Sequence, residues 1–248
     1  MRLKIVLEYD GTRYSGWQKQ NNAKTIQGTL ITTLESVFGK TRGKDRLIDL
    51  QGAGRTDAGV HAIEQVAHLD CETMLSPNII QIKLNDELPS DINILSIEKS
   101  AKDFHARHSA VSRQYLFRIS KRRTAFEKKY VWWIRDALDI DAIQRSAAIL
   151  TGMHDFSSFS EADKENKSTM VFLEDINVYE EEDLIMIRIK ASHFLWKMVR
   201  RIVGTLVEVG RGNVNEARIK YLLENKSNET AVYTAPPSGL FLEKVFYK

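Results

Sequence analysis

A tight loop is predicted for the stretch Gln51-Gly52-Ala53-Gly54-Arg55-Thr56-Asp57-Ala58-Gly59-Val60-His61-Ala62. The residues 47–50 before it and the alternating residues 65–69 after it both show strand patterns. Glycine adopts backbone angles that are closed to other residues and lets another group approach the chain closely. We therefore expect two strands joined by a shaped loop that carries one carboxylate, Asp57.

The rest of the first half supplies partners for these strands. Residues 3–7 alternate between apolar and polar side chains, and residues 92–97 form a second strand pattern. Thr25 is a good cap for a helix that ends near residue 38, and Ser76-Pro77 begins a second helix. The predicted order is β-α-β-β-α-β.

The second half shows a similar succession of patterns. Helices are expected from Asp139 or Asp141 to residue 150, and over residues 194–209 and 217–223. Strands are expected over residues 115–119, 176–179, 184–189 and 240–246, with residues 130–134 as a further candidate.

The two halves predict an α+β fold made of two ferredoxin-like, split β-α-β units. We place the first unit at residues 1–105 and the second at residues 106–248. Their mainly antiparallel sheets are expected to meet and form a central cleft, which is a common place for a binding site.

Composition narrows the class of protein. Cys71 is the only cysteine among 248 residues, which excludes a disulfide framework and a cysteine-based zinc site. The longest apolar run, residues 130–134, is far shorter than the roughly 20 residues of a membrane helix. No signal-peptide pattern precedes the first strand, so we expect a cytoplasmic protein without a membrane anchor. The net charge of +3 weakly favours an acidic partner such as nucleic acid.

The glycine-rich loop allows two interpretations from its residues alone. Arg55 and Asp57 are two positions apart, so an extended backbone would send both side chains to the same side. The loop lacks the endings of phosphate-binding motifs. An aspartate among glycines also commonly does no more than form a turn by bonding its own backbone.

Ordered blocks along the chain resemble the tRNA pseudouridine synthase A family. The run GAGRTDAGVHA at residues 52–62 matches its signature. The other blocks are YDGT at 9–12, GWQ at 16–18, LPSDI at 88–92, FHAR at 104–107 with SA at 109–110, RQY at 113–115, HDFSSF at 154–159, MVR at 198–200 with VGTL at 203–206, and TAP at 234–236 with GL at 239–240. The resemblance covers essentially the whole chain and implies a pseudouridine synthase fold.

This resemblance implies a reaction. Family members isomerise uridine to pseudouridine at positions 38, 39 and 40 of the tRNA anticodon stem-loop, without a cofactor. The essential aspartate falls on Asp57 and its partner arginine on Arg200. Helical periodicity does not separate Arg200 from Arg201, so only the family position favours Arg200. The sequence leaves open whether Asp57 attacks covalently or removes a proton.

Three further residues take site roles from the resemblance. Tyr115 matches the tyrosine that stacks on the target uracil, although a strand aromatic can also simply face the core. Arg55 matches an arginine that helps to displace the target base, with a structural salt bridge as the alternative. Leu240 matches an apolar wall of the uracil pocket, but a closing strand needs core leucines in any case.

The expected partners are tRNA and a second copy of the chain. By family position, the RNA contacts are Arg55, Ile63, Glu64, Gln65, Phe104, His105, Ala106, Arg107 and His108. Basic residues that would extend this track are Arg113, Arg118, Lys121, Arg122, Arg123, Lys128, Lys129, Arg200, Arg201 and Arg211. His105 and His108 are too few for a metal site, and no metal is expected.

A rival hypothesis is a non-catalytic tRNA-binding or RNA-folding protein on the same scaffold. It is disfavoured because a carboxylate such as Asp57 repels phosphate. Departures from the family pattern affect other positions. Residues 167–172, which include Met170, lack an arginine that many relatives carry, and Lys197 stands where a small amide is common.

Overall fold

The computed structural model describes residues 1–41, 43, 45–162 and 168–248. Contacts divide the chain into two compact units, Met1–Val111 with Leu242–Lys248 and Ser112–Phe241. The last strand groups with the first unit from Leu242 onward, whereas the predicted halves assign the whole strand to the second. Within the described ranges, no helix combines the length and the apolar character needed to span a membrane.

The sheet of the first unit surrounds the predicted loop. It contains β1 (Arg2–Tyr9), β2 (Arg46–Gly52), β3 (His61–Glu72), β4 (Ile92–Lys99) and β10 (Leu240–Tyr247). The strands follow the order β4-β1-β3-β10, and β2 also pairs with β3. Because β1 is antiparallel to both neighbours and β2 is antiparallel to β3, the mainly antiparallel α+β class is confirmed.

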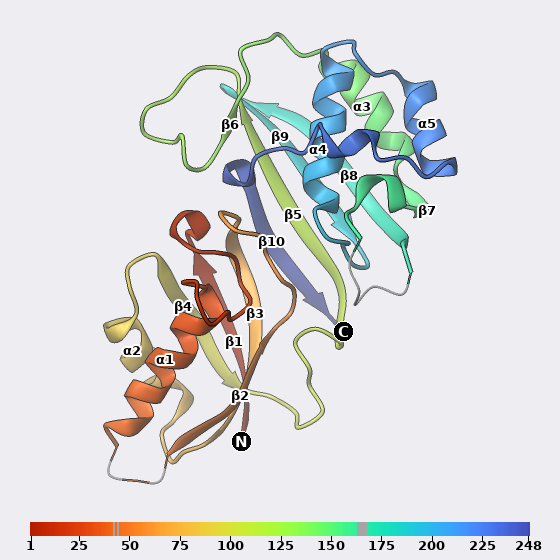
Figure 1. Ribbon diagram of the computed structural model, residues 1–248. Helices are drawn as coiled ribbons and strands as arrows, with labels where there is room; N and C mark the ends of the chain where they lie inside the picture. Colours follow the sequence, from red (N-terminus) through yellow and green to blue (C-terminus); the bar gives the residue numbers. More distant parts are fainter. Residues whose placement is uncertain (42, 44, 163–167) are drawn as a thin grey trace. The chain divides into compact units, whose positions relative to one another are not determined.

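The helices of the first unit begin at the predicted caps. The Thr25 side chain accepts a hydrogen bond from an amide in the first turn of α1 (Ile26–Gly39). Ser76 does the same for α2 (Pro77–Glu87), whose first residue is proline. Figure 1 shows α1 and α2 next to each other beside the strands of this unit. Their apolar faces and the buried residues of β1 form its core.

The second unit has its own antiparallel strands. They are β5 (Ala110–Ser120), β9 (Leu184–Ala191), β8 (Met170–Glu181) and β7 (Gly152–Asp155), in that spatial order. The two-residue strand β6 (Trp132–Trp133) runs parallel to β5. The helices are α3 (Ile140–Ile149), α4 (Met198–Gly210) and α5 (Glu216–Glu224). Asp139 caps α3, which settles the choice between Asp139 and Asp141.

The sequence patterns misplace one element of the second unit and miss another. The helix expected from residue 194 begins only at Met198, because Lys197 has φ 60° and ψ 5°. This left-handed conformation does not continue a right-handed helix. Strand β7 has no strand pattern of its own and forms because it pairs with β8 from Gly152↔Leu173 to Asp155↔Met170.

Candidate active site

The Asp57 loop, residues 53–60, is held by backbone hydrogen bonds. The amide of Trp17 donates to the carbonyl of Thr56 at 3.1 Å, and the amide of Gly59 donates to the carbonyl of Tyr14 at 3.2 Å. At its start, the amide of Ala53 donates to the carbonyl of Val66 at 2.7 Å. Because peptide groups make these bonds, the shape of the loop depends little on the side chains involved.

Gly16 allows the neighbouring segment to reach this loop. Its φ is +86°, and a Cβ added to it would lie 2.5 Å from the carbonyl oxygen of Thr56. Real Cβ atoms do not approach a backbone oxygen so closely, and other residues rarely adopt this φ. Glycine is therefore required here for the bond between Trp17 and Thr56 to form.

Tyr14 fixes the same segment to the rest of the first unit. Its hydroxyl donates to the Asp91 carboxylate at 2.6 Å, and the Lys24 ammonium lies 4.6 Å from the ring centroid. Burial, together with the Asp91 carboxylate, raises the pKa of Tyr14 above its ordinary value. The hydroxyl thus stays protonated and donates at neutral pH.

A small polar network lies beneath the loop. The hydroxyls of Thr56 and Tyr9 are 2.8 Å apart. The Gln65 amide donates to the carbonyl of Gly54 at 3.0 Å and to the Tyr9 hydroxyl at 3.4 Å. Burial raises the pKa of Tyr9 to about 12. This network holds Thr56 in the interior, whereas its neighbours Arg55 and Asp57 are more exposed.

Exposure alternates along the loop. Arg55 is exposed, Thr56 is 7% exposed and Asp57 is half-buried. This alternation agrees with an extended backbone that sends Arg55 and Asp57 to one side. A turn follows directly, since the amide of Val60 donates to the carbonyl of Asp57 at 3.1 Å. The turn is thus closed by the backbone carbonyl of Asp57, next to an extended stretch that includes Arg55.

Tyr115 lies on β5 in the second unit. It is 8% exposed, is paired with Ile189 of β9, and its ring meets that of Phe194 edge-on at a centroid distance of 4.9 Å. Leu240 begins β10 and is 4% exposed. Both residues are thus buried, as their core alternatives require, and both are apolar surfaces of the kind that a base can contact.

Arg200 is oriented by the segment before β10. Its Nε donates to the carbonyl of Ala235 at 2.7 Å, and the amide of Ala235 donates to the carbonyl of Arg200 at 3.0 Å. One turn further along α4, a Cβ on Gly204 would lie 1.5 Å from the carbonyl oxygen of Tyr233. The glycine lets this segment approach the helix closely enough to hold the Arg200 guanidinium.

Arg201 behaves differently from Arg200. The residue is 5% exposed, Nη1 donates to the carbonyl of Ser160 at 2.7 Å, and burial lowers the pKa of Arg201. Arg201 is therefore a structural residue, and its expected place in a solvent-facing basic track is wrong. Periodicity could not reveal this, because apolar residues surround α4 almost completely.

Lys197 precedes α4 in the left-handed conformation and pairs with Glu161. Asparagine adopts this backbone region several-fold more readily than most residues. The small amide that is common at this position thus fits the left-handed backbone, whereas the lysine found here is not favoured in that conformation. Of residues 167–172, Lys167 lies outside the described part of the chain, and Met170 begins β8 with its side chain exposed.

The expected RNA contacts in the first unit differ in exposure. Ile63 is 40% exposed, and Glu64 lies 3.8 Å from the Lys244 ammonium. Gln65 is buried beneath the Asp57 loop. In the segment 104–108, Arg107 and His108 are exposed, Phe104 and His105 are half-buried, and Ala106 is fully buried.

Acidic neighbours pair with three more basic residues of the expected track. Lys121 pairs with Glu180 and Arg122 with Asp183. Arg211 binds both Asp136 and Glu208. This part of the expected track therefore presents less positive charge than the sequence suggests.

Sequence reasoning missed the residues that hold the Asp57 loop. Tyr9, Tyr14 and Asp91 lie within or beside the family-like blocks, but their local patterns only indicate a strand and two turns. The signal that could have found Gly16 is its place in a Gly-Trp-Gln block that no helix or strand pattern explains.

Comparison with known proteins agrees with the loop sequence. A family model described as tRNA pseudouridine synthase matches residues 5–109 and 146–248. The chain belongs to this family. Similar proteins named tRNA pseudouridine synthase A occur in Thermoanaerobacter sp. (strain X514), 39% identical over 98% of each chain, and in Sinorhizobium medicae, 39% identical over 99% of each chain. That of Bartonella tribocorum is 40% identical over 99% of each chain.

Proposed function

We propose that the protein isomerises uridine to pseudouridine at positions 38, 39 and 40 of the tRNA anticodon stem-loop. The observation that carries this proposal is the half-buried Asp57 on a loop whose backbone is fixed from both sides. Membership of the tRNA pseudouridine synthase family supplies the reaction. A fixed carboxylate meets the need of a reaction that gains much of its rate from orientation.

The reaction exchanges one bond for another within a nucleotide. The N1–C1′ bond breaks, the uracil turns, and C5 bonds to C1′. The hydrogen on C5 leaves to solvent, and N1 gains a proton. Atoms and charge balance without an oxidant, so this chain's residues need only bind, orient, and either move protons or form and break one bond to the nucleotide. Asp57 acts on the flipped-out uridine as nucleophile or as base.

The other site residues take roles that fit their settings. We assign Arg200 as the cation that favours the ionised aspartate. Tyr115 is the stacking surface for the uracil, and Leu240 is an apolar wall. Arg55 is exposed, and we assign its guanidinium to the place of the displaced base. Flipping costs a few kcal/mol, less where the base is in a loop.

The RNA track follows from the exposure of its residues. Ile63, Glu64, Arg107 and His108 reach the surface and contact the tRNA, together with Phe104 and His105. Gln65 and Ala106 are buried and act by holding the Asp57 loop and the segment 104–108. We further propose that the protein works on cytoplasmic tRNA as a homodimer, which light scattering of the purified protein would measure.

Tritium release tests the proposed activity. The protein is incubated with tRNA that carries tritium at uracil C5 and has uridine at only one of positions 38, 39 and 40. We expect release from each such tRNA and none when all three positions are cytidine. Binding of tRNA without release would instead support a non-catalytic RNA-binding protein.

A further inference from the structure

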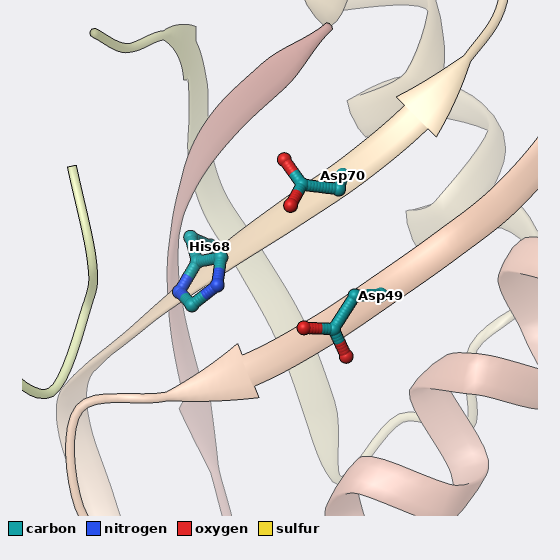
Figure 2. Close-up of side chains that lie close together, drawn as sticks. All are labelled: Asp49, His68 and Asp70. Atoms are coloured by element: carbon teal, nitrogen blue, oxygen red, sulfur yellow. The ribbon is translucent and has the colours of Figure 1, made fainter. Parts of the chain in front are cut away.

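Polar side chains gather on the first unit away from the Asp57 loop. Asp70 of β3 lies opposite Arg2 of β1 and opposite Asp49 of β2. His68 precedes Asp70 by two residues and so lies on the same face of the sheet. Figure 2 shows its ring beside both carboxylates, and one potential ligand atom from each of these three side chains lies within 4.8 Å of the others.

The spacing of this cluster suits a metal ion, but its hydrogen bonds do not. Both Asp70 carboxylate oxygens accept from Arg2, at 2.8 Å from Nε and 2.6 Å from Nη2. Nδ1 of His68 accepts from the amide of Ala106 at 3.2 Å. A neutral imidazole has one nitrogen lone pair to offer, and Ala106 uses it. In this cluster the ring of His68 therefore binds the backbone of the distant segment that contains Ala106.

His105 uses its ring in the same way. Its Nδ1 accepts from the amides of Arg107 and His108, at 3.2 Å and 3.3 Å. The amide of Ser109 donates to the carbonyl of His105 at 2.9 Å, which closes the turn. Both rings thus carry their proton on Nε2 and lose their acceptor if a second proton binds at Nδ1.

The turn is tied to the sheet by further side chains. Nη1 of Arg2 donates to the carbonyl of Phe104 at 2.9 Å, and the Tyr247 hydroxyl donates to the carbonyl of Ala106 at 2.8 Å. The rings of His68 and His105 have centroids 4.6 Å apart. Strands β1, β3 and β10 therefore all supply side chains that bind this segment.

This anchoring determines what the turn presents. Ala106 is 0% exposed against His68, whereas the neighbouring Arg107 and His108 are exposed. A guanidinium and an imidazole in a fixed turn suit the phosphate backbone of RNA. Order that exists before binding lowers the entropic cost of the complex.

We propose that His68 and His105 are positioning residues for tRNA: as neutral rings they fix the turn 105–108, so that Arg107 and His108 contact the RNA backbone. This inference rests on the proposed function, because tRNA is the ligand assigned to the turn. Neither histidine touches the Asp57 loop in any hydrogen bond described above. Their loss therefore affects the binding of tRNA and leaves the chemical step intact.

The groups around the two rings keep them neutral. Burial is the main cause that lowers the pKa of His68, and the nearby His105 and Arg2 lower it further. Asp70 and Asp49 have a smaller effect in the opposite direction. Burial, then His108 and Arg2, lowers the pKa of His105, with Asp49 acting in the opposite direction. Both rings are thus in the form that accepts hydrogen bonds at neutral pH.

Hydrogen exchange of the free protein, followed by tRNA binding and turnover, tests the proposal. His68→Leu removes the acceptor, and His68→Asn keeps one near the position of Nδ1. We expect His68→Leu to speed amide exchange in residues 104–109, weaken tRNA binding about tenfold and leave turnover at saturating tRNA unchanged. His68→Asn should retain most of both properties.

Two controls separate the possible failures. Tyr247→Phe removes a different bond to Ala106 and should change exchange and affinity in the same direction, even if His68→Leu folds poorly. His154→Asn removes a histidine in the second unit and should change neither. Unchanged exchange in both His68→Leu and Tyr247→Phe, or faster exchange with unchanged affinity, would overturn the proposal. A wild-type protein without tritium release would overturn the proposed function instead, whatever the exchange data show.

Discussion

The Asp57 loop and the turn 105–108 belong to the same unit but are held by different groups. Backbone amides of Trp17 and Gly59 connect the Asp57 loop to the segment before α1. Side chains of Arg2, His68 and Tyr247 hold the turn. The Asp57 loop is thus fixed mainly by peptide groups, with one side-chain bond from Gln65 to the carbonyl of Gly54, whereas the turn 105–108 depends on side-chain bonds that substitution or protonation can remove.

The largest expected effect comes from the glycine that lets two backbones meet. Gly16→Val places a branched side chain at φ +86° and against the carbonyl of Thr56. We expect it to lower the free energy of unfolding by about 3 kcal/mol or more and to abolish activity. Denaturant unfolding and tritium release measure the two effects.

Gly54→Ala is the matched control within the Asp57 loop. A Cβ at Gly54 meets no atom within 4 Å, and its φ lies outside the region that favours glycine. The free energy of unfolding of the Gly54→Ala variant should differ from that of the wild type by no more than about 0.5 kcal/mol. Equal losses in the two variants would show that the backbone contact at Gly16 does not hold the loop.

The turn 105–108 should respond to pH through His68 and His105. The fold disfavours the protonated forms of His68 and His105, whose pKa values lie below the ordinary 6.5. The turn is therefore fully held above pH 6.5 and loses stability as the pH falls below that value toward the folded-state pKa values. The affinity of the wild type for tRNA, measured separately from tritium release, should weaken about tenfold over this range.

Replacement of both titrating rings provides the check on this pH dependence. The double variant His68→Asn, His105→Asn cannot gain a proton at these sites, so its tRNA affinity should vary much less between neutral and acidic pH. An identical pH profile in the wild type and the double variant would assign the effect to other groups.

A smaller effect is expected at the turn before α4. Lys197→Asn replaces a residue with φ 60° by one that tolerates this conformation, at the cost of the partly exposed pair with Glu161. We expect a gain of about 0.5 kcal/mol in unfolding free energy. Glu161→Gln removes this pair and also the 3.9 Å ion pair between Glu161 and Arg201, so a loss in Lys197→Asn as large as in Glu161→Gln would show that the backbone at Lys197 is not strained.

The sequence predicts those elements whose signals are local. Thr25, Ser76 and Asp139 each cap the helix expected of them, because a side-chain oxygen and the next amides lie within one turn. The strands around residues 51–62 follow from alternation. The family blocks name Asp57 and Arg200, and the structure adds the bonds that orient them.

The missed features depend on residues far apart in the chain. His68 alternates like any strand residue, and its role appears only with Ala106, which lies 38 positions away. Strand β7 needs β8, and the grouping of the last strand with the first unit depends on pairing over nearly the whole chain. Arg201 is buried by a segment that contains Ser160, which helical periodicity cannot describe.

The most direct measurement compares Asp57→Asn with the wild type on tRNA labelled with tritium at uracil C5. The substitution removes the charge and keeps the shape, and the backbone bonds of the loop remain. We predict that tritium release falls by at least about a thousandfold while tRNA affinity stays within about twofold. Normal release by the variant would contradict the assignment of Asp57 as the catalytic residue.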